Sequence, residues 1–192
     1  TGQNGIDFTS DKGANWDGEY FCTSPTSGFH SGIRSLNTNP FSGHTFLSGR
    51  KCEQLLTPEF IHKYSTNNGA TWNNFNFSEF IVLSKMVFVS AQVGLAFSET
   101  RIYKTIDGGL NWALTSFSGG SIKSLIKNDD DKCFVSTNNG IYTSDDLGNN
   151  WNHEAPLASF NQLHYDTIQN IYYASDQSNG VFKSFDGFTW SN

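Results

Sequence analysis

Residues 144–151 read SDDLGNNW, and the same pattern occurs at five places in the chain. We call each copy a box. Every box begins with Ser or Thr, has Asp or Asn two residues later, and has Gly three residues before Trp. The copies are TSDKGANW (9–16), STNNGATW (65–72), TIDGGLNW (105–112), SDDLGNNW (144–151) and the shorter SFDGFTW (184–190). Five copies with one spacing indicate an internal repeat.

The tryptophans measure the repeat length. Trp72, Trp112, Trp151 and Trp190 are 40, 39 and 39 residues apart, whereas Trp16 and Trp72 are 56 apart. A period near 40 is typical of a four-stranded β-propeller blade. The longer first interval predicts an insertion of about 16 residues within 23–60, a segment that holds three of the four prolines.

The text between the boxes predicts short strands. In the fourth repeat, 121–127, 132–137, 141–144 and 150–155 are strand-like and are separated by a polar turn, an Asn-Gly turn and the box. No sustained helical periodicity occurs. Aromatic residues make up 15% of the chain and there are 18 glycines, which also favours β-structure. We expect an all-β chain of four-stranded antiparallel meanders.

The residues of the box predict a stapled turn between the third and fourth strands of each blade. A carboxylate or amide oxygen accepts unpaired backbone N–H groups, the glycine adopts a positive φ, and the tryptophan packs between sheets. The structural positions are Asp11, Gly13, Trp16, Asn67, Gly69, Trp72, Asp107, Gly109, Trp112, Asp146, Gly148, Trp151, Asp186, Gly187 and Trp190.

These boxes resemble the Asp-box, or bacterial neuraminidase repeat, of β-propellers in sialidases, sortilin-type receptors, two-propeller xyloglucanases and photosystem II assembly factors. The resemblance covers nearly the whole chain and implies a propeller with its boxes on the periphery, remote from the central face where ligands bind. It specifies a fold and leaves the function open. Asn67 in place of Asp and the shortened fifth copy depart from the family pattern.

The repeats predict about four and a half blades in a single propeller domain, or part of one, over 1–192. The approximate boundaries are 1–20, 21–77, 78–117, 118–157 and 158–192. The first repeat holds only a third and a fourth strand, and little sequence follows Trp190. We expect the ring to be completed by further blades from additional sequence or from another chain, because open sheet faces are costly.

Charge excludes one class of partner. The net charge is -6 with only 12 Lys and Arg, which argues against nucleic acid. No apolar run is long enough to cross a membrane as a helix. We expect no cofactor and no metal site, since the histidines are dispersed and the acidic run 129–131 lacks the alternating ligand pattern of a calcium loop. Cys22 and Cys52 are either a disulfide or two thiols.

Binding or scaffolding is the function we expect, with a glycan or protein ligand at the central face and the loop around 23–60. The candidate binding residues are Phe29, His30, Arg34, Phe41, His44 and Phe46. The resemblance further implies a secreted or cell-surface protein.

A glycoside hydrolase is the alternative function. Xyloglucanase-like chemistry needs two opposed carboxylates, and Asp166 is the best single candidate, with Glu79 and Glu99 weaker. A turn-capping role for Asp166 is the competing interpretation. Sialidase chemistry would use an arginine triad, and the chain has three arginines, Arg34, Arg50 and Arg101, but lacks the Arg-Ile-Pro opening of that family. We lean against an enzyme.

Overall fold

The computed structural model describes residues 4–8, 14–15, 17–22, 32–50, 60–77, 79–154 and 160–192, with the backbone alone for 4–8 and 17–22. The chain forms two compact units, Thr1–Val93 with Thr105–Trp112, and Gly94–Lys104 with Ala113–Asn192. All regular structure in the described part is β-strand, as predicted. In that part, no helix is long and apolar enough to span a bilayer.

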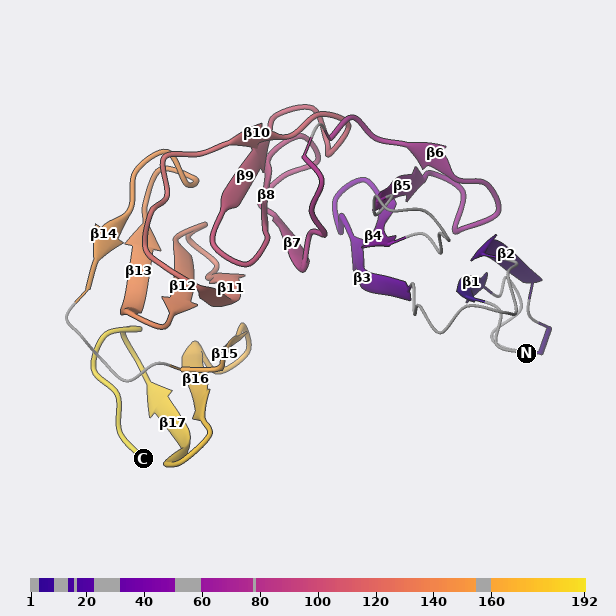
Figure 1. Cartoon of the computed structure of the whole chain (residues 1–192). Helices are drawn as coiled ribbons and strands as arrows, with labels where there is room; N and C mark the ends of the chain where they lie inside the picture. Colours follow the sequence, from indigo (N-terminus) through magenta and orange to yellow (C-terminus); the bar gives the residue numbers. More distant parts are fainter. Residues whose placement is uncertain are drawn as a thin grey trace. The chain divides into compact units, whose positions relative to one another are not determined.

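Five antiparallel sheets follow one another along the chain, and the strands of each are neighbours in sequence (Figure 1). The first sheet pairs β1 (Asn4–Phe8) with β2 (Asp17–Cys22). The later sheets are β3 (Gly32–Thr38), β4 (Thr45–Arg50), β5 (Phe60–Ser65), β6 (Asn73–Asn74); β7 (Lys85–Phe88), β8 (Gly94–Phe97), β9 (Ile102–Thr105), β10 (Ala113–Leu114); β11 (Ile122–Lys127), β12 (Cys133–Thr137), β13 (Gly140–Ser144), β14 (Asn152–His153); and β15 (Gln162–Asp166), β16 (Ile171–Asp176), β17 (Gly180–Ser184).

These sheets are the blades of a β-propeller, and the fourth repeat confirms the predicted strands closely. The segments predicted at 121–127, 132–137 and 141–144 are β11, β12 and β13. The predicted fourth strand is only two residues long in β14. In the last sheet a single bridge from Lys183 to Ser191 stands in its place. The fourth strands are short because the box tryptophan, just before them, turns into the core instead of extending the ladder.

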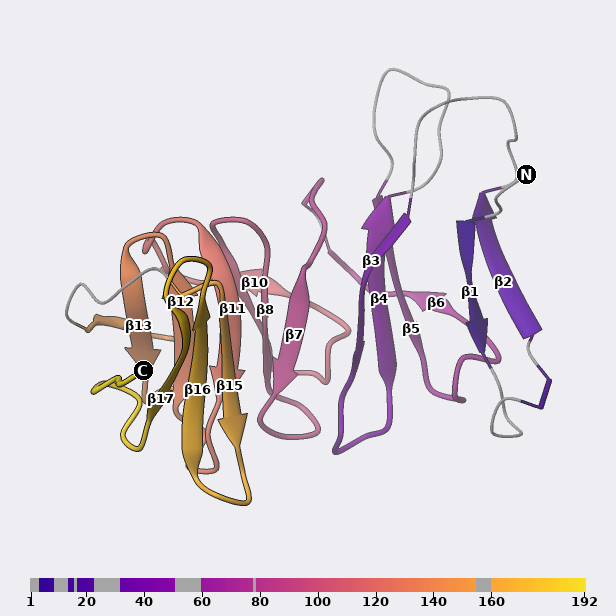
Figure 2. The ribbon, with the colours of Figure 1, turned by 90° about the horizontal axis from the view of Figure 1, so that it is seen from below.

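Apolar side chains from both faces of the sheets form the core. In the second unit the core cluster joins β11, β12 and β13 to β15 and β16, through residues such as Ile126, Phe134, Leu163 and Tyr172. β11 lies beside β15, as Figures 1 and 2 both show. In the first unit β3, β4 and β5 run side by side and Phe46 and Leu47 of β4 have no exposed surface (Figure 2). Burial of such large side chains contributes about 2 kcal/mol each.

Candidate binding surface

The box turns account for their conserved-looking polar residues by internal hydrogen bonds. In the box at 144–151, Ser144 Oγ donates to Asp146 Oδ1 at 2.9 Å and accepts the Gly148 N–H at 2.8 Å. Asp146 then accepts the Asn150 N–H at 2.8 Å and the Asn150 side-chain amide at 2.6 Å. The backbone N–H of Asn150 lowers the pKa of Asp146, because it binds the charged form.

The other described boxes repeat this pattern. Thr105 and Asp107, like Ser184 and Asp186, form the same hydroxyl-to-carboxylate bond, at 2.8 Å in both boxes. Asn67 replaces the aspartate in its box and still accepts from Ser65, at 2.9 Å, and from the Thr71 N–H, at 2.9 Å. The carboxylates are therefore occupied by their own turns and are not free for chemistry. Asp11, Gly13 and Trp16 lie outside the described residues.

Each described box glycine also lies directly on a side chain from the second strand of the preceding sheet. A Cβ added at Gly109 would be 2.6 Å from the Phe46 ring, one at Gly148 would be 2.8 Å from Leu95, and one at Gly187 would be 2.5 Å from the Phe134 ring. Glycine is required there by close approach as well as by its positive φ. The boxes are seats that join one sheet to the next.

Phe46 therefore corrects one of the sequence predictions. It was expected among the binding residues, but its side chain has 0% exposure and lies beneath Gly109, stacked on Phe88 with ring centroids 5.4 Å apart. An aromatic residue in the second position of a second strand serves the contact between sheets. The sequence around 41–46 does not distinguish such a residue from an exposed one.

The opposite end of the second sheet has a different character. In the register of β4 and β5, Thr45 pairs with Ser65 at the box end, whereas Arg50 pairs with Phe60 at the other end. The Arg50 guanidinium carbon is 5.5 Å from the centre of the Phe60 ring. The Phe60 and Phe80 rings are 6.5 Å apart, and Phe80 is 81% exposed. We call Arg50, Phe60 and Phe80 the Arg50 patch.

The segment that carries Phe80 is held in place at Leu83. Ser48 Oγ accepts the Leu83 N–H at 2.9 Å, and Ser35 Oγ donates to the Leu83 carbonyl at 2.5 Å. The Leu83 side chain is fully buried. With both backbone groups and the side chain of Leu83 fixed, the exposed ring three residues earlier is anchored to the sheet below it.

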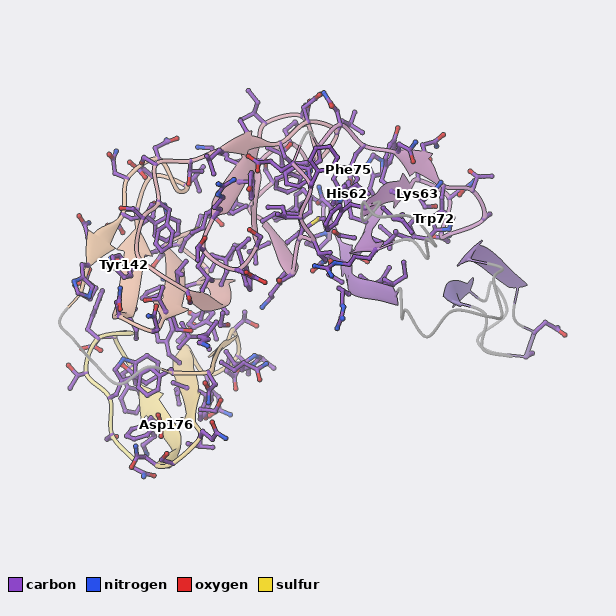
Figure 3. All side chains as sticks on the ribbon, viewed as in Figure 1. His62, Lys63, Trp72, Phe75, Tyr142 and Asp176 are labelled. Carbon is purple, nitrogen blue, oxygen red and sulfur yellow. The ribbon has the colours of Figure 1, made fainter. Side chains whose placement is uncertain are left out.

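His62 completes this network from β5. Its Nδ1 lies 3.1 Å from Ser48 Oγ, and its ring contacts Phe75 and Phe77 with centroids 5.4 and 4.8 Å apart (Figure 3). Burial lowers the pKa of His62 to about 4, and a backbone hydrogen bond with Ile81 opposes this only in part. The imidazole is therefore neutral at pH 7 and accepts the Ser48 hydroxyl proton through Nδ1.

The remaining predicted binding residues separate into two groups. Arg34 is exposed on β3, at the bulge just beyond the pair of Gly32 with Arg50, so it lies at the same end of the sheet as the patch. Phe41, 54% exposed, and the half-buried His44 lie in the turn between β3 and β4, at the box end. Phe29 and His30 lie outside the described residues. Phe60 and Phe80 were missed, because the apolar run from 80 reads as the start of a strand.

The proposed catalytic carboxylate has a structural role. Asp166 Oδ1 accepts the backbone N–H groups of Ile168 and Gln169, at 2.8 and 3.1 Å, and so caps the turn from β15 to β16. Glu79 is half-buried beside Phe80, and Glu99 is exposed before β9.

The acidic run 129–131 is likewise a turn. Asn128 Oδ1 accepts the N–H groups of Asp130 and Lys132, at 3.1 and 2.9 Å, and Asp131 pairs with Lys127 at 2.7 Å. Within the described residues no group of three or more His, Cys, Asp or Glu could hold a metal ion. Cys133 is a buried free thiol, while Cys52 lies outside the described residues.

Comparison with known proteins supports the fold. No family model and no curated protein matches the sequence. The chain is similar to the structure of YCF48 bound to D1 peptide, with a TM-score of 0.66, 15% identity, and coverage of 98% of this chain and 61% of that one.

Two other structures are similar. A GH74 enzyme from Niastella koreensis has a TM-score of 0.61 and 16% identity, over 83% of this chain and 30% of the enzyme. The extracellular domain of a putative one-component system from B. thetaiotaomicron has a TM-score of 0.67 and 11% identity, over 95% and 25%. The chain thus spans less than two thirds of each of these structures.

Proposed function

We propose that the chain is a non-catalytic binding module that recognises a protein partner through the Arg50 patch. The observation that carries the proposal is the 81% exposure of Phe80 beside Phe60 and Arg50. Aromatic residues and arginine are the side chains that dominate the binding energy of protein interfaces. An exposed ring held on a rigid sheet loses little conformational entropy on binding.

The surroundings of the patch support the same function. Arg34 is exposed at the same end of the sheet and adds a second guanidinium. The buried contacts of Leu83 hold the Phe80 segment, so the surface is formed before a partner arrives. One similar structure, that of YCF48, has a peptide bound.

Glycoside hydrolysis is the weaker proposal. It draws support from the likeness to a GH74 enzyme. Against it, Asp166 spends its Oδ1 on two backbone N–H groups, and the box aspartates that we describe are satisfied by their own turns. We also propose a secreted or cell-surface location, which the likeness to an extracellular domain supports.

Selection from a phage-displayed peptide library on the immobilised protein tests the proposed function. We expect enriched peptides that lose at least about tenfold in affinity for Phe80→Ser and Arg50→Ala. Ile168→Ser is the matched control, because Ile168 is 91% exposed in a turn of another sheet. Peptides that bind the Phe80→Ser variant as tightly as the natural chain would place the site elsewhere. A glycan array run in parallel would identify a carbohydrate ligand instead.

A further inference from the structure

The last sheet, β15–β17, presents one face that the preceding sheets show how to cover. Tyr172 of β16 is buried and its ring is 4.9 Å from that of Phe134 in β12. Because successive side chains of a strand point to opposite faces, Tyr173 points away from the sheet β11–β14. Tyr173 pairs with His164 on β15 and with Lys183 on β17, so these three side chains share the outward face.

The same positions in the sheet before it are buried under a neighbour. Phe134 pairs with Ile126 and Thr143, and Ser136 pairs with Ile141. Phe134, Ile126 and Ile141 are 1%, 7% and 0% exposed, and Gly187 of the next box lies on the Phe134 ring. Their counterparts in the last sheet are Tyr173, His164 and Val181, and Val181 is 62% exposed.

Three described contacts define what fits such a face. Gly109 lies on Phe46, Gly148 on Leu95 and Gly187 on Phe134, and each time a box glycine meets the second-strand side chain of the preceding sheet. Tyr173 is the next member of this series. Its ring offers the same flat surface as Phe46 and Phe134.

We propose that this open face, formed by His164, Tyr173, Val181 and Lys183, docks a blade from a second copy of the chain, with a box glycine against the Tyr173 ring. The partner is a copy because the chain itself carries the box turns that cover such a face three times over. The face also suits a contact that forms between separate molecules. It has His164 and Lys183 at its periphery, and interfaces that spend time in water are more polar than a domain core.

The contact surface has continuity with the interfaces inside the chain. In the first unit, the face of β3–β5 that Gly109 covers also mixes apolar and polar groups, since Phe46 there neighbours Asn37 and His62. Asn37 Oδ1 accepts the Met86 N–H at 3.0 Å across that contact. A face with a central aromatic ring and polar neighbours is thus already used for sheet docking in this protein.

Sedimentation velocity of the full chain across a wide concentration range tests the proposal, which is independent of the Arg50 patch. We expect concentration-dependent association that Tyr173→Glu and Val181→Glu each weaken at least about tenfold, since each places a charge in the contact. Ile168→Glu is the control, because Ile168 is 91% exposed in the turn of the same sheet and off the face. Circular dichroism and urea unfolding check that every variant is folded.

Each outcome of this experiment is decisive. A chain that stays monomeric at all concentrations overturns the proposal, as does association that Tyr173→Glu and Val181→Glu leave unchanged. Equal weakening by Ile168→Glu would also overturn it, because the effect would then follow from charge alone. Loss confined to the two face variants supports it.

Discussion

Acid should destabilise the sheet β3–β6 through one buried histidine. Burial lowers the pKa of His62 to about 4 from the usual 6.5, so the unfolded chain binds its proton more tightly than the folded chain does. The stabilisation associated with neutral His62 is therefore fully present above pH 6.5 and is lost as the pH falls through 4.

The magnitude follows from these two pKa values. Between pH 8 and pH 5 the free energy of unfolding should fall by about 2 kcal/mol from this group, and by about 3.4 kcal/mol once the pH is below both values. His62→Asn removes the titration and keeps an acceptor near Nδ1 for the Ser48 hydroxyl. The variant should be less stable at pH 8, because the contacts with Phe75 and Phe77 shrink, but it should lose about 2 kcal/mol less on acidification.

Urea unfolding followed by tryptophan fluorescence at pH 8, 7, 6 and 5 measures this difference. Subtracting the two proteins cancels the titration of all other groups. Leu47→Val is the matched control, since it shortens a fully buried side chain of β4 and leaves His62 in place, so it should lower stability equally at each pH. A difference between natural chain and His62→Asn that changes by less than about 0.5 kcal/mol from pH 8 to pH 5 would refute the reasoning.

Three further predictions concern the boxes and the buried thiol. Asp107→Asn should cost about 1–2 kcal/mol in urea unfolding because it sets two amide groups against each other at Asn111, and adding Asn111→Thr should recover part of that loss by copying the pair in which Asn67 donates to Thr71 at 2.9 Å; additive losses would contradict this. Leu147→Gly should raise the melting temperature with a gain of about 1 kcal/mol, because Leu147 has a φ of 58° where the other boxes place Asn68 and Gly108, and an unchanged or lower melting temperature would count against strain there. Burial, assisted by Asp131, raises the pKa of Cys133 to about 12, so peptide mass spectrometry should find Cys133 unmodified by iodoacetamide in the folded chain and modified in urea, and rapid labelling without urea would contradict the buried position.

Much of the fold was predictable because its determinants are local. The order Ser or Thr, Asp, Gly, Trp sets up hydrogen bonds within a single turn, such as those of Ser144 and Asp146, and local chemistry is legible in sequence. The strands between the boxes follow from the Asn-Gly turn at 139–140 and from alternation, and β11, β12 and β13 confirm them.

The candidate site was less predictable because it depends on register between distant residues. Arg50 meets Phe60 only because β4 and β5 pair across a long connection, and Phe80 joins them from a different sheet's approach segment. Phe46 shows the reverse error. Its sequence surroundings suggest a loop-borne ligand residue, and its burial depends on Gly109, more than sixty residues away.

By itself, the sequence determined the repeat, the all-β class and the roles of the box residues, because each of these rests on contacts within a few residues of one another. Only the tertiary structure decided which aromatic rings are buried between sheets and which are exposed, since that depends on what the next sheet places against them. Phe134 and Tyr173 make the point: both are aromatic residues near the start of a strand, and Gly187 covers the first whereas the described part of the chain leaves the second half-open.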